Sequence, residues 1–138
     1  MPSTISINTS QLRRLVGCPD APLLIDVRAD ADFSADARLL PAAQRQNAGA
    51  VGAWASSLRG KRAVVICRHG GSRSEGAAAW LRAEGVEAET LEGGFEAWRD
   101  GGGLLLKTDA LPPCDPAGRT VWVTRARPKV DRIACPWL

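Results

Sequence analysis

The residues best suited to chemistry lie in the stretch Cys-Arg-His-Gly-Gly-Ser-Arg-Ser, which runs from Cys67 to Ser74. The two adjacent glycines allow backbone conformations that a side chain would forbid. Such a loop can turn its N–H groups toward an anion, and a helix that begins directly after it adds a partial positive charge. These surroundings favour the thiolate form of a cysteine, which is the nucleophile. The competing interpretation is that Cys67 is only a small buried hydrophobe at the end of a strand.

The polar groups of this loop are candidate substrate-binding residues. Two arginines supply full positive charge, and the serines can donate hydrogen bonds to an oxyanion. We expect Arg73 to make the better contact, because it closes the loop beside the start of a helix. The single histidine is not assigned as a general base, because the sequence identifies no acid that would orient it. The predicted site has Cys67 as catalytic residue and Arg68, His69, Gly70, Gly71, Ser72, Arg73 and Ser74 as substrate-binding residues.

Apolar runs alternate with helical segments along the first hundred residues. Residues 22–27 (PLLIDV) and 62–67 (RAVVIC) are short, continuous apolar runs bounded by turn residues, which is typical of buried parallel strands. We expect Ser10 to be the N-cap of a first helix and residues 74–84 to form another. This alternation predicts an α/β fold, with a mostly parallel central sheet between layers of helices. Three tryptophans are expected in the core: Trp54, Trp80 and Trp98.

Composition and charge limit the class of protein. The chain has 138 residues, of which 45% are hydrophobic, so it can bury a core of its own. The net charge of +3 does not by itself indicate a nucleic-acid partner. The N-terminus lacks the layout of a signal peptide, and no apolar run approaches the ~20 residues of a membrane span. We therefore expect a cytoplasmic protein without membrane association. With one histidine and no Cys-x-x-Cys pair, we expect no metal site and no cofactor.

The composition changes after Gly103. The stretch KTDALPPCDPAG is rich in proline and glycine, as a linker is, and TVWVT then begins a new apolar pattern. The predicted organisation is a first domain over residues 1–105, a linker over 106–119, and the truncated start of a second domain over 120–138. Arginine and lysine crowd this tail, but it contains no recognised nucleic-acid-binding motif, so we expect no such partner.

Three stretches resemble the rhodanese family of sulfurtransferases, in the family's order and spacing. LLIDVRADADF (23–33) is similar to its Asp-Val-Arg strand, AVVICRHGGSRS (63–74) to its active-site loop, and LEGGFEAW (91–98) to its Gly-Gly-x-x-x-Trp segment. The resemblance implies a rhodanese fold with a persulfide on Cys67. It further implies transfer of sulfane sulfur from a small anionic donor, such as thiosulfate, to a thiol acceptor. Asp26 and Arg28 match the strand motif, where the resemblance implies a structural role.

Two departures from the family pattern leave alternatives open. Residues 37–43 (ARLLPAA) replace the usual Gly-His-Ile-Pro-Gly-Ala stretch and keep only Pro41 and Ala43. Arg73 follows Cys67 by six positions, where sulfurtransferase loops of the family typically place an arginine after five. The longer loop resembles those of rhodanese-fold dual-specificity phosphatases and arsenate reductases, which would hold a tetrahedral oxyanion. A phosphatase also needs a general acid, for which the nearby candidates are Asp30, Asp32 and Glu75.

The tail adds a second resemblance. Residues 127–138 (RPKVDRIACPWL) are similar to the opening of the chromate-resistance protein domain, to which rhodanese domains are known to be fused. The leading hypothesis is therefore a sulfurtransferase in a chromate or oxyanion setting. The alternatives are a cysteine-based phosphatase or arsenate reductase, and a non-catalytic module that binds anions or a partner. The sequence leaves the oligomeric state open.

Overall fold

The computed structural model describes residues 5–110, 115–117 and 119 of the chain. Residues Met1–Thr108 belong to one compact unit, and the residues from Asp109 onward to a second one. The predicted second domain over 120–138, together with Cys114 and Cys135, lies outside the described residues.

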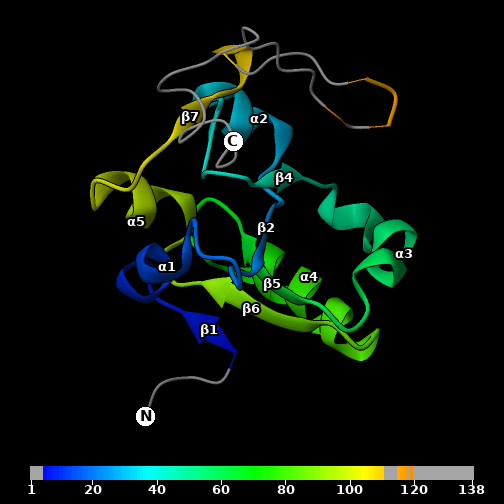
Figure 1. Ribbon diagram of the computed structural model, residues 1–138. Coiled ribbons are helices and arrows are strands. Elements are labelled where there is room, and N and C mark those ends of the chain that lie inside the picture. Colours follow the sequence, from blue (N-terminus) through cyan, green and yellow to red (C-terminus); the bar gives the residue numbers. More distant parts are fainter. Residues whose placement is uncertain (1–4, 111–114, 118, 120–138) are drawn as a thin grey trace, which may run out of the picture. The chain divides into compact units, whose positions relative to one another are not determined.

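A five-stranded sheet forms the middle layer of the first unit (Figure 1). Its strand order is β1-β6-β5-β2-β4, and every neighbouring pair is parallel. The predicted α/β fold, with a mostly parallel sheet flanked by helices, is confirmed. The strands are β1 (Ser6–Ile7), β2 (Leu23–Asp26), β4 (Gln44–Arg45), β5 (Arg62–Ile66) and β6 (Glu87–Leu91).

Helices cover both faces of the sheet (Figure 1). α3 (Val51–Trp54) and α4 (Ser72–Ala83) bury side chains on one face. α1 (Thr9–Leu15) and α5 (Gly94–Asp100) bury theirs on the other. The remaining elements are α2 (Asp30–Ala35), the antiparallel pair β3 (Arg38–Leu39) and β7 (Leu106–Lys107), and the 3-10 turns η1 (Ala48–Ala50), η2 (Ala55–Leu58) and η3 (Thr108–Ala110).

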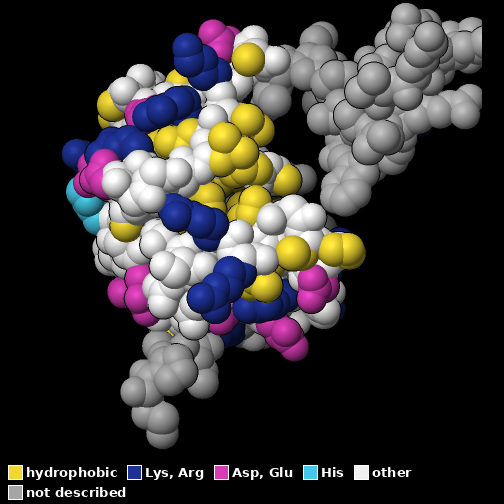
Figure 2. Space-filling model, turned by 60° about the vertical axis from the view of Figure 1, so that its left-hand side comes forward, with side chains coloured by type: hydrophobic (Ala, Val, Ile, Leu, Met, Phe, Trp, Pro, Cys, Tyr) yellow, Lys and Arg dark blue, Asp and Glu magenta, His cyan; other side chains and the backbone are white. Residues whose placement is uncertain are grey.

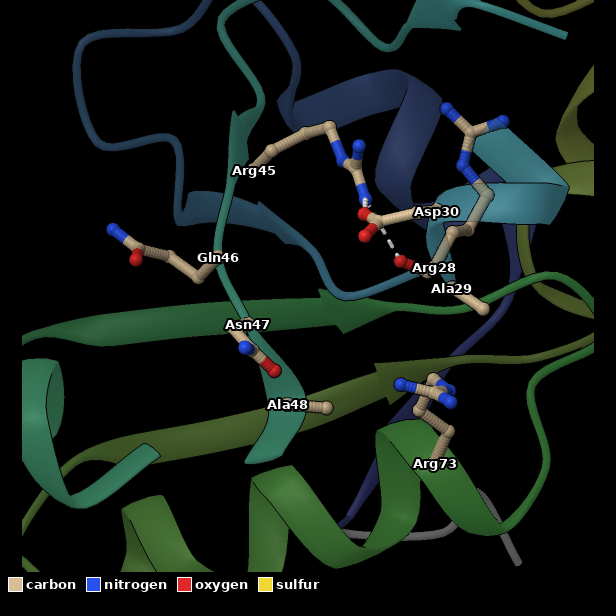
Figure 3. A pocket seen from close by; sticks show the side chains of 8 residues that line it. All are labelled: Arg28, Ala29, Asp30, Arg45, Gln46, Asn47, Ala48 and Arg73. Atoms are coloured by element: carbon tan, nitrogen blue, oxygen red, sulfur yellow. Dashed lines mark hydrogen bonds and ion pairs between the residues drawn. The ribbon is translucent and has the colours of Figure 1, made fainter. Parts of the chain in front are cut away.

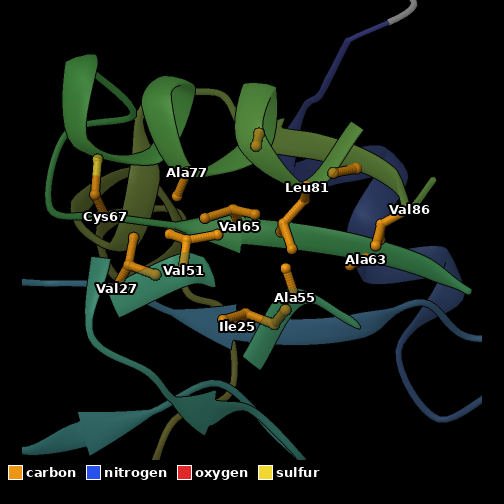
Figure 4. Packing of buried hydrophobic residues seen from close by; sticks show 12 residues of the cluster. Ile25, Val27, Val51, Ala55, Ala63, Val65, Cys67, Ala77, Leu81 and Val86 are labelled. Carbon is orange, nitrogen blue, oxygen red and sulfur yellow. The ribbon is translucent and has the colours of Figure 1, made fainter. Parts of the chain in front are cut away.

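Strand β5 sets the direction of the candidate nucleophile. Successive side chains of a strand point to opposite faces of a sheet. Val65 therefore packs in the core beneath α4, and Ile66 in the core on the other face. Cys67 follows directly and returns to the α4 side, where its sulfur points to the first turn of that helix (Figure 4).

The expectation that Ser10 caps the first helix is wrong. Asn8 is the N-cap, because its Oδ1 accepts a hydrogen bond from the Gln11 N–H at 2.8 Å. The Gln11 Oε1 in turn accepts one from the Asn8 N–H at 3.0 Å. This reciprocal pair is a capping box, so the helix begins at Thr9 and includes Ser10.

The expectation that Trp80 belongs to the core is also wrong, because 53% of its surface is exposed. The face of α4 that meets the sheet is made of smaller side chains, with Ala77 and Leu81 buried. The Trp80 ring lies instead beside Gly52 of α3, on the outside of the helix pair. Trp98 is buried in the core, as predicted. Trp54 is only partly buried and packs against the core cluster on the opposite face of the sheet.

The surface of the described residues is mixed in charge. On the face shown in Figure 2, lysine and arginine side chains alternate with aspartate and glutamate side chains, rather than forming one continuous basic area. Within the described ranges, no helix is both long enough and apolar enough to cross a membrane.

Candidate active site

The sulfur of Cys67 is held between the loop that follows β5 and the first turn of α4. Cys67 is only 5% exposed. Its Sγ accepts a hydrogen bond from the Gly70 N–H at 3.2 Å and lies 3.1 Å from the Ser74 Oγ. Ser74 is fully buried, and its hydroxyl also reaches the Gly71 carbonyl oxygen at 3.1 Å. A negative charge on this sulfur would therefore meet the Gly70 N–H. It would also meet the Ser74 O–H once that hydroxyl turns from the Gly71 carbonyl oxygen to the sulfur.

The loop also offers backbone N–H groups that find no acceptor in the part of the chain that the structure describes. Helix α4 begins at Ser72, two residues before the predicted start, and its N-cap Gly71 has no side chain with which to cap it. Uncapped N–H groups at a helix start attract anions. Among the described residues, no acceptor is found for the N–H groups of Arg68, His69, Gly71, Ser72, Arg73 and Ser74.

A cavity of about 250 Å³ opens over the sulfur. The predicted site residues divide into two groups there. Gly70 and Ser74 contact the sulfur itself, and the others line the cavity. In the part of the chain that is described, no cluster of three or more His, Cys, Asp or Glu side chains is placed to bind a metal ion. The lining residues are Asp32, Cys67, Arg68, His69, Gly71, Ser72 and Arg73.

Arg68 and His69 share a carboxylate that sequence reasoning missed. The Arg68 Nε donates to Glu96 Oε1 at 2.7 Å, and the His69 Nδ1 lies 3.0 Å from Glu96 Oε2. The Arg68 guanidinium also contacts Asp32 at 3.3 Å. The hydrogen bond from Arg68 is the main reason why the pKa of Glu96 lies below its ordinary value. The charge of Arg68 is thus balanced by two carboxylates, and His69 has the orienting acid that the sequence did not reveal.

Arg73 is the arginine of the loop whose charge is not balanced by such a pair. Within the described residues its side chain forms no ion pair and no hydrogen bond. It lines the cavity over Cys67 and also a second cavity, which Arg28, Asp30 and Arg45 help to line. An anion that reaches the sulfur would therefore meet Arg73 as a free positive charge.

The turn between β6 and α5 braces the loop from behind. The Phe95 N–H donates to the Cys67 carbonyl oxygen at 2.8 Å, and the Glu96 N–H donates to that of Arg68 at 3.1 Å. Gly94 makes this contact possible. Its φ of +62° is left-handed, and a Cβ at this position would collide with the carbonyl oxygens of Cys67 and Arg68. The second glycine of the Gly-Gly pair in the sequence motif is therefore a packing requirement of the active-site loop.

Asp26 and Arg28 pack against the turn between β6 and α5 that holds the active-site loop. They form a buried ion pair at 2.8 Å, with each side chain 1% exposed. The Arg28 guanidinium stacks on the Phe95 ring, 3.8 Å from its centroid. Its other N–H groups donate to the carbonyl oxygens of Asp36 and Arg38. This arrangement fits a structural role, because the donors of Arg28 are already satisfied.

The chain matches the family model of the rhodanese-like domain over residues 8–100, and it belongs to that family. A rhodanese-related protein from Thermoplasma volcanium has a similar structure, with a TM-score of 0.64 and 25% identity over 74% of this chain and 97% of the other. A Rhodopseudomonas palustris protein described as a possible tyrosine phosphatase is also similar. Its TM-score is 0.62 and its identity 26%, over 74% of this chain and 84% of the other. The thiosulfate sulfurtransferase of Pseudomonas aeruginosa shares the fold, with a TM-score of 0.64 and 23% identity over 80% of this chain and 21% of that one.

Proposed function

We propose that the protein is a sulfurtransferase that carries sulfane sulfur as a persulfide on Cys67. The observation that carries the proposal is the placement of one buried thiol against the Gly70 N–H and the Ser74 hydroxyl, below a small cavity. The outer sulfur of a persulfide would extend into that cavity. The uncommitted loop amides and Arg73 would stabilise its charge and that of the donor.

Loading begins when the Cys67 thiolate attacks the outer sulfur of thiosulfate. A bond forms between the two sulfur atoms, and the S–S bond of thiosulfate breaks with its electron pair on the leaving sulfite. The loop amides and Arg73 bind the sulfonate oxygens and stabilise the leaving group. Because the donor is a small dianion, it needs no larger space than the cavity provides.

Unloading is the reverse type of displacement. A thiolate acceptor attacks the outer sulfur of the Cys67 persulfide, and the persulfide bond breaks with its electron pair on the Cys67 sulfur. The Cys67 thiolate that is released would accept hydrogen bonds from the Gly70 N–H and the Ser74 hydroxyl. The acceptor leaves as a persulfide, and no external oxidant or reductant is consumed.

The test is the rate of sulfite release from thiosulfate with a thiol present. We expect steady release by the wild-type chain and none by Cys67→Ser. The matched control is Cys18→Ser, because Cys18 is exposed and lies outside the described site. Equal rates in Cys67→Ser and the wild type would refute the proposal.

A second candidate is a cysteine-based phosphatase, favoured by one observation. Of the three acids considered as proton donors, Asp32 lines the cavity over Cys67, whereas Asp30 lines the second cavity. Hydrolysis of an aryl phosphate that is lost in Cys67→Ser, Arg73→Gln and Asp32→Asn alike would favour this reaction. Hydrolysis that persists in Asp32→Asn would show that Asp32 is not the proton donor, and the phosphatase candidate would lose its support.

A further inference from the structure

A second cavity is lined by Arg73 but not by Cys67 (Figure 3). It has a volume of about 390 Å³, within the range of small-molecule sites. Arg45 and Asp30 lie on one side of it, Asn47 and Ala48 on another, and Arg73 reaches in from α4. Arg73 lines this cavity and the one over Cys67, so the two spaces are neighbours.

The charge of this cavity is positive. Arg28 contributes little, because Asp26 balances it inside the core. Among the described residues, Arg45 forms an ion pair only with Asp30, at 3.2 Å. The Asp30 side chain is fully exposed, which makes such a pair weak. Arg73 has no partner among the described residues. Two guanidinium groups therefore face one solvated carboxylate.

The donors in the cavity are only partly used. One terminal nitrogen of Arg45 donates to the Arg28 carbonyl oxygen at 2.9 Å and to Asp30 at 3.2 Å, and the other forms no hydrogen bond in the described part of the chain. The Asn47 Oδ1 accepts from the Gly49 N–H at 2.8 Å, which leaves the NH₂ group of that amide to donate. Guanidinium and amide donors together suit a carboxylate, which an arginine can bind through two parallel hydrogen bonds.

We propose that this cavity binds the carboxylate of the sulfur acceptor, which is then a small thiol that carries a carboxylate. The inference rests on the proposed function, because the acceptor thiolate would attack a persulfide on Cys67. Its carboxylate would contact Arg45 and Asn47, its chain would pass Arg73, and its sulfur would enter the cavity over Cys67. The transfer breaks the persulfide bond, leaves the electron pair on Cys67 and forms a new S–S bond on the acceptor.

The experiment compares two acceptors of equal length, β-mercaptopropionate and its neutral amide. The chain is loaded with thiosulfate, freed of excess donor and mixed with each thiol, and loss of the persulfide is followed by intact mass. Each rate is divided by the rate of the same thiol with a small disulfide, which removes its intrinsic nucleophilicity. We expect a preference for the carboxylate of about tenfold, the size of one charge-assisted hydrogen bond.

Two variants should move this preference in opposite directions. Arg45→Gln should reduce the rate preference for the carboxylate thiol to about one. Asp30→Asn should increase it, because the Asp30 carboxylate competes with the acceptor carboxylate for Arg45. The matched control is Arg62→Gln, the same change at the start of β5, where Arg62 pairs with Glu89. The ratio of the two thiols is insensitive to the folded fraction of a variant. A wild-type ratio near one, or an Arg45→Gln ratio equal to that of the wild type, would overturn the inference.

A second readout separates the cavity from the sulfur chemistry. In the unloaded chain, titration with propionate should shift the backbone amide NMR signals of Gln46 and Asn47, and Arg45→Gln should abolish the shift. If thiosulfate fails to load Cys67, the proposed function fails, but this titration still decides whether the cavity binds carboxylates. If Cys67 loads and propionate shifts no signal in the wild type, the cavity assignment alone is wrong.

Discussion

Replacing Gly94 by alanine should destabilise the active-site loop by more than the conformational penalty of placing alanine in a left-handed backbone. Gly94 has a φ of +62°, and an alanine in this region costs about 1–2 kcal/mol. A Cβ at this position would also collide with the carbonyl oxygens of Cys67 and Arg68 and with the Gly70 nitrogen. These are backbone atoms, which cannot swing aside as the end of a side chain can, so they can yield only if the loop moves away from α5.

The movement has a definite cost. It breaks the hydrogen bonds from Phe95 to Cys67 and from Glu96 to Arg68. At about 1 kcal/mol for each hydrogen bond, added to the backbone penalty, the free energy of unfolding should fall by about 3–4 kcal/mol. Displacement of Gly70 would also remove its N–H from the sulfur, so persulfide loading should fall with stability.

Gly102→Ala is the matched control. Gly102 has a φ of +76°, but a Cβ there would meet no atom within 4 Å. This variant should lose about 1–2 kcal/mol from the backbone penalty alone and keep its loading rate. The assay is urea unfolding of both variants beside the wild type. Losses that agree within about 0.5 kcal/mol, near the limit of additivity, would refute the claim that the glycine turn braces the loop.

Three further changes test other parts of the structure. Ala42 adopts a φ of +62°, where the family pattern has glycine, so Ala42→Gly should raise the free energy of unfolding by up to about 1 kcal/mol; a loss on urea unfolding would contradict this. Asp26→Asn leaves the buried Arg28 charge unpaired and should lower the midpoint of thermal unfolding, at a cost of about 3–5 kcal/mol; a cost below about 1 would mean that the pair is not structural. The lowered pKa of Glu96 means that its pair with Arg68 stabilises the fold above the ordinary value of 4.5, and that this stability is lost as the pH falls through the lowered pKa. Glu96→Gln should therefore lose stability less steeply than the wild type in urea titrations below about pH 5, and parallel curves would show that the pair contributes nothing.

The sheet and the position of the candidate nucleophile could be predicted from the sequence because the signals are local. β2 and β5 are continuous apolar runs, as strands buried on both faces must be. The glycines after Cys67 indicate a tight loop, and the helix that follows is marked by its composition. The register then fixes the face of the sheet from which Cys67 points, because side chains alternate along β5.

The parts that sequence reasoning missed depend on contacts between distant segments. Glu96 is an ordinary surface acid of α5 until the fold brings it to Arg68 and His69. Arg45 lies in a two-residue strand with no recognisable pattern, and only the pairing of β4 with β2 brings it beside the loop that carries Arg28. No local signal could have identified either residue. The exposure of Trp80 has the same cause, because it depends on which side chains of α4 the sheet accepts.

The most direct test of the account is the intact mass of the fully reduced chain after exposure to thiosulfate, beside the Cys67→Ser variant. The account predicts that the wild type gains one sulfur atom and that the variant gains none. A folded wild-type chain that gains no sulfur, or a Cys67→Ser variant that gains as much, would contradict the assignment of Cys67 as a persulfide carrier.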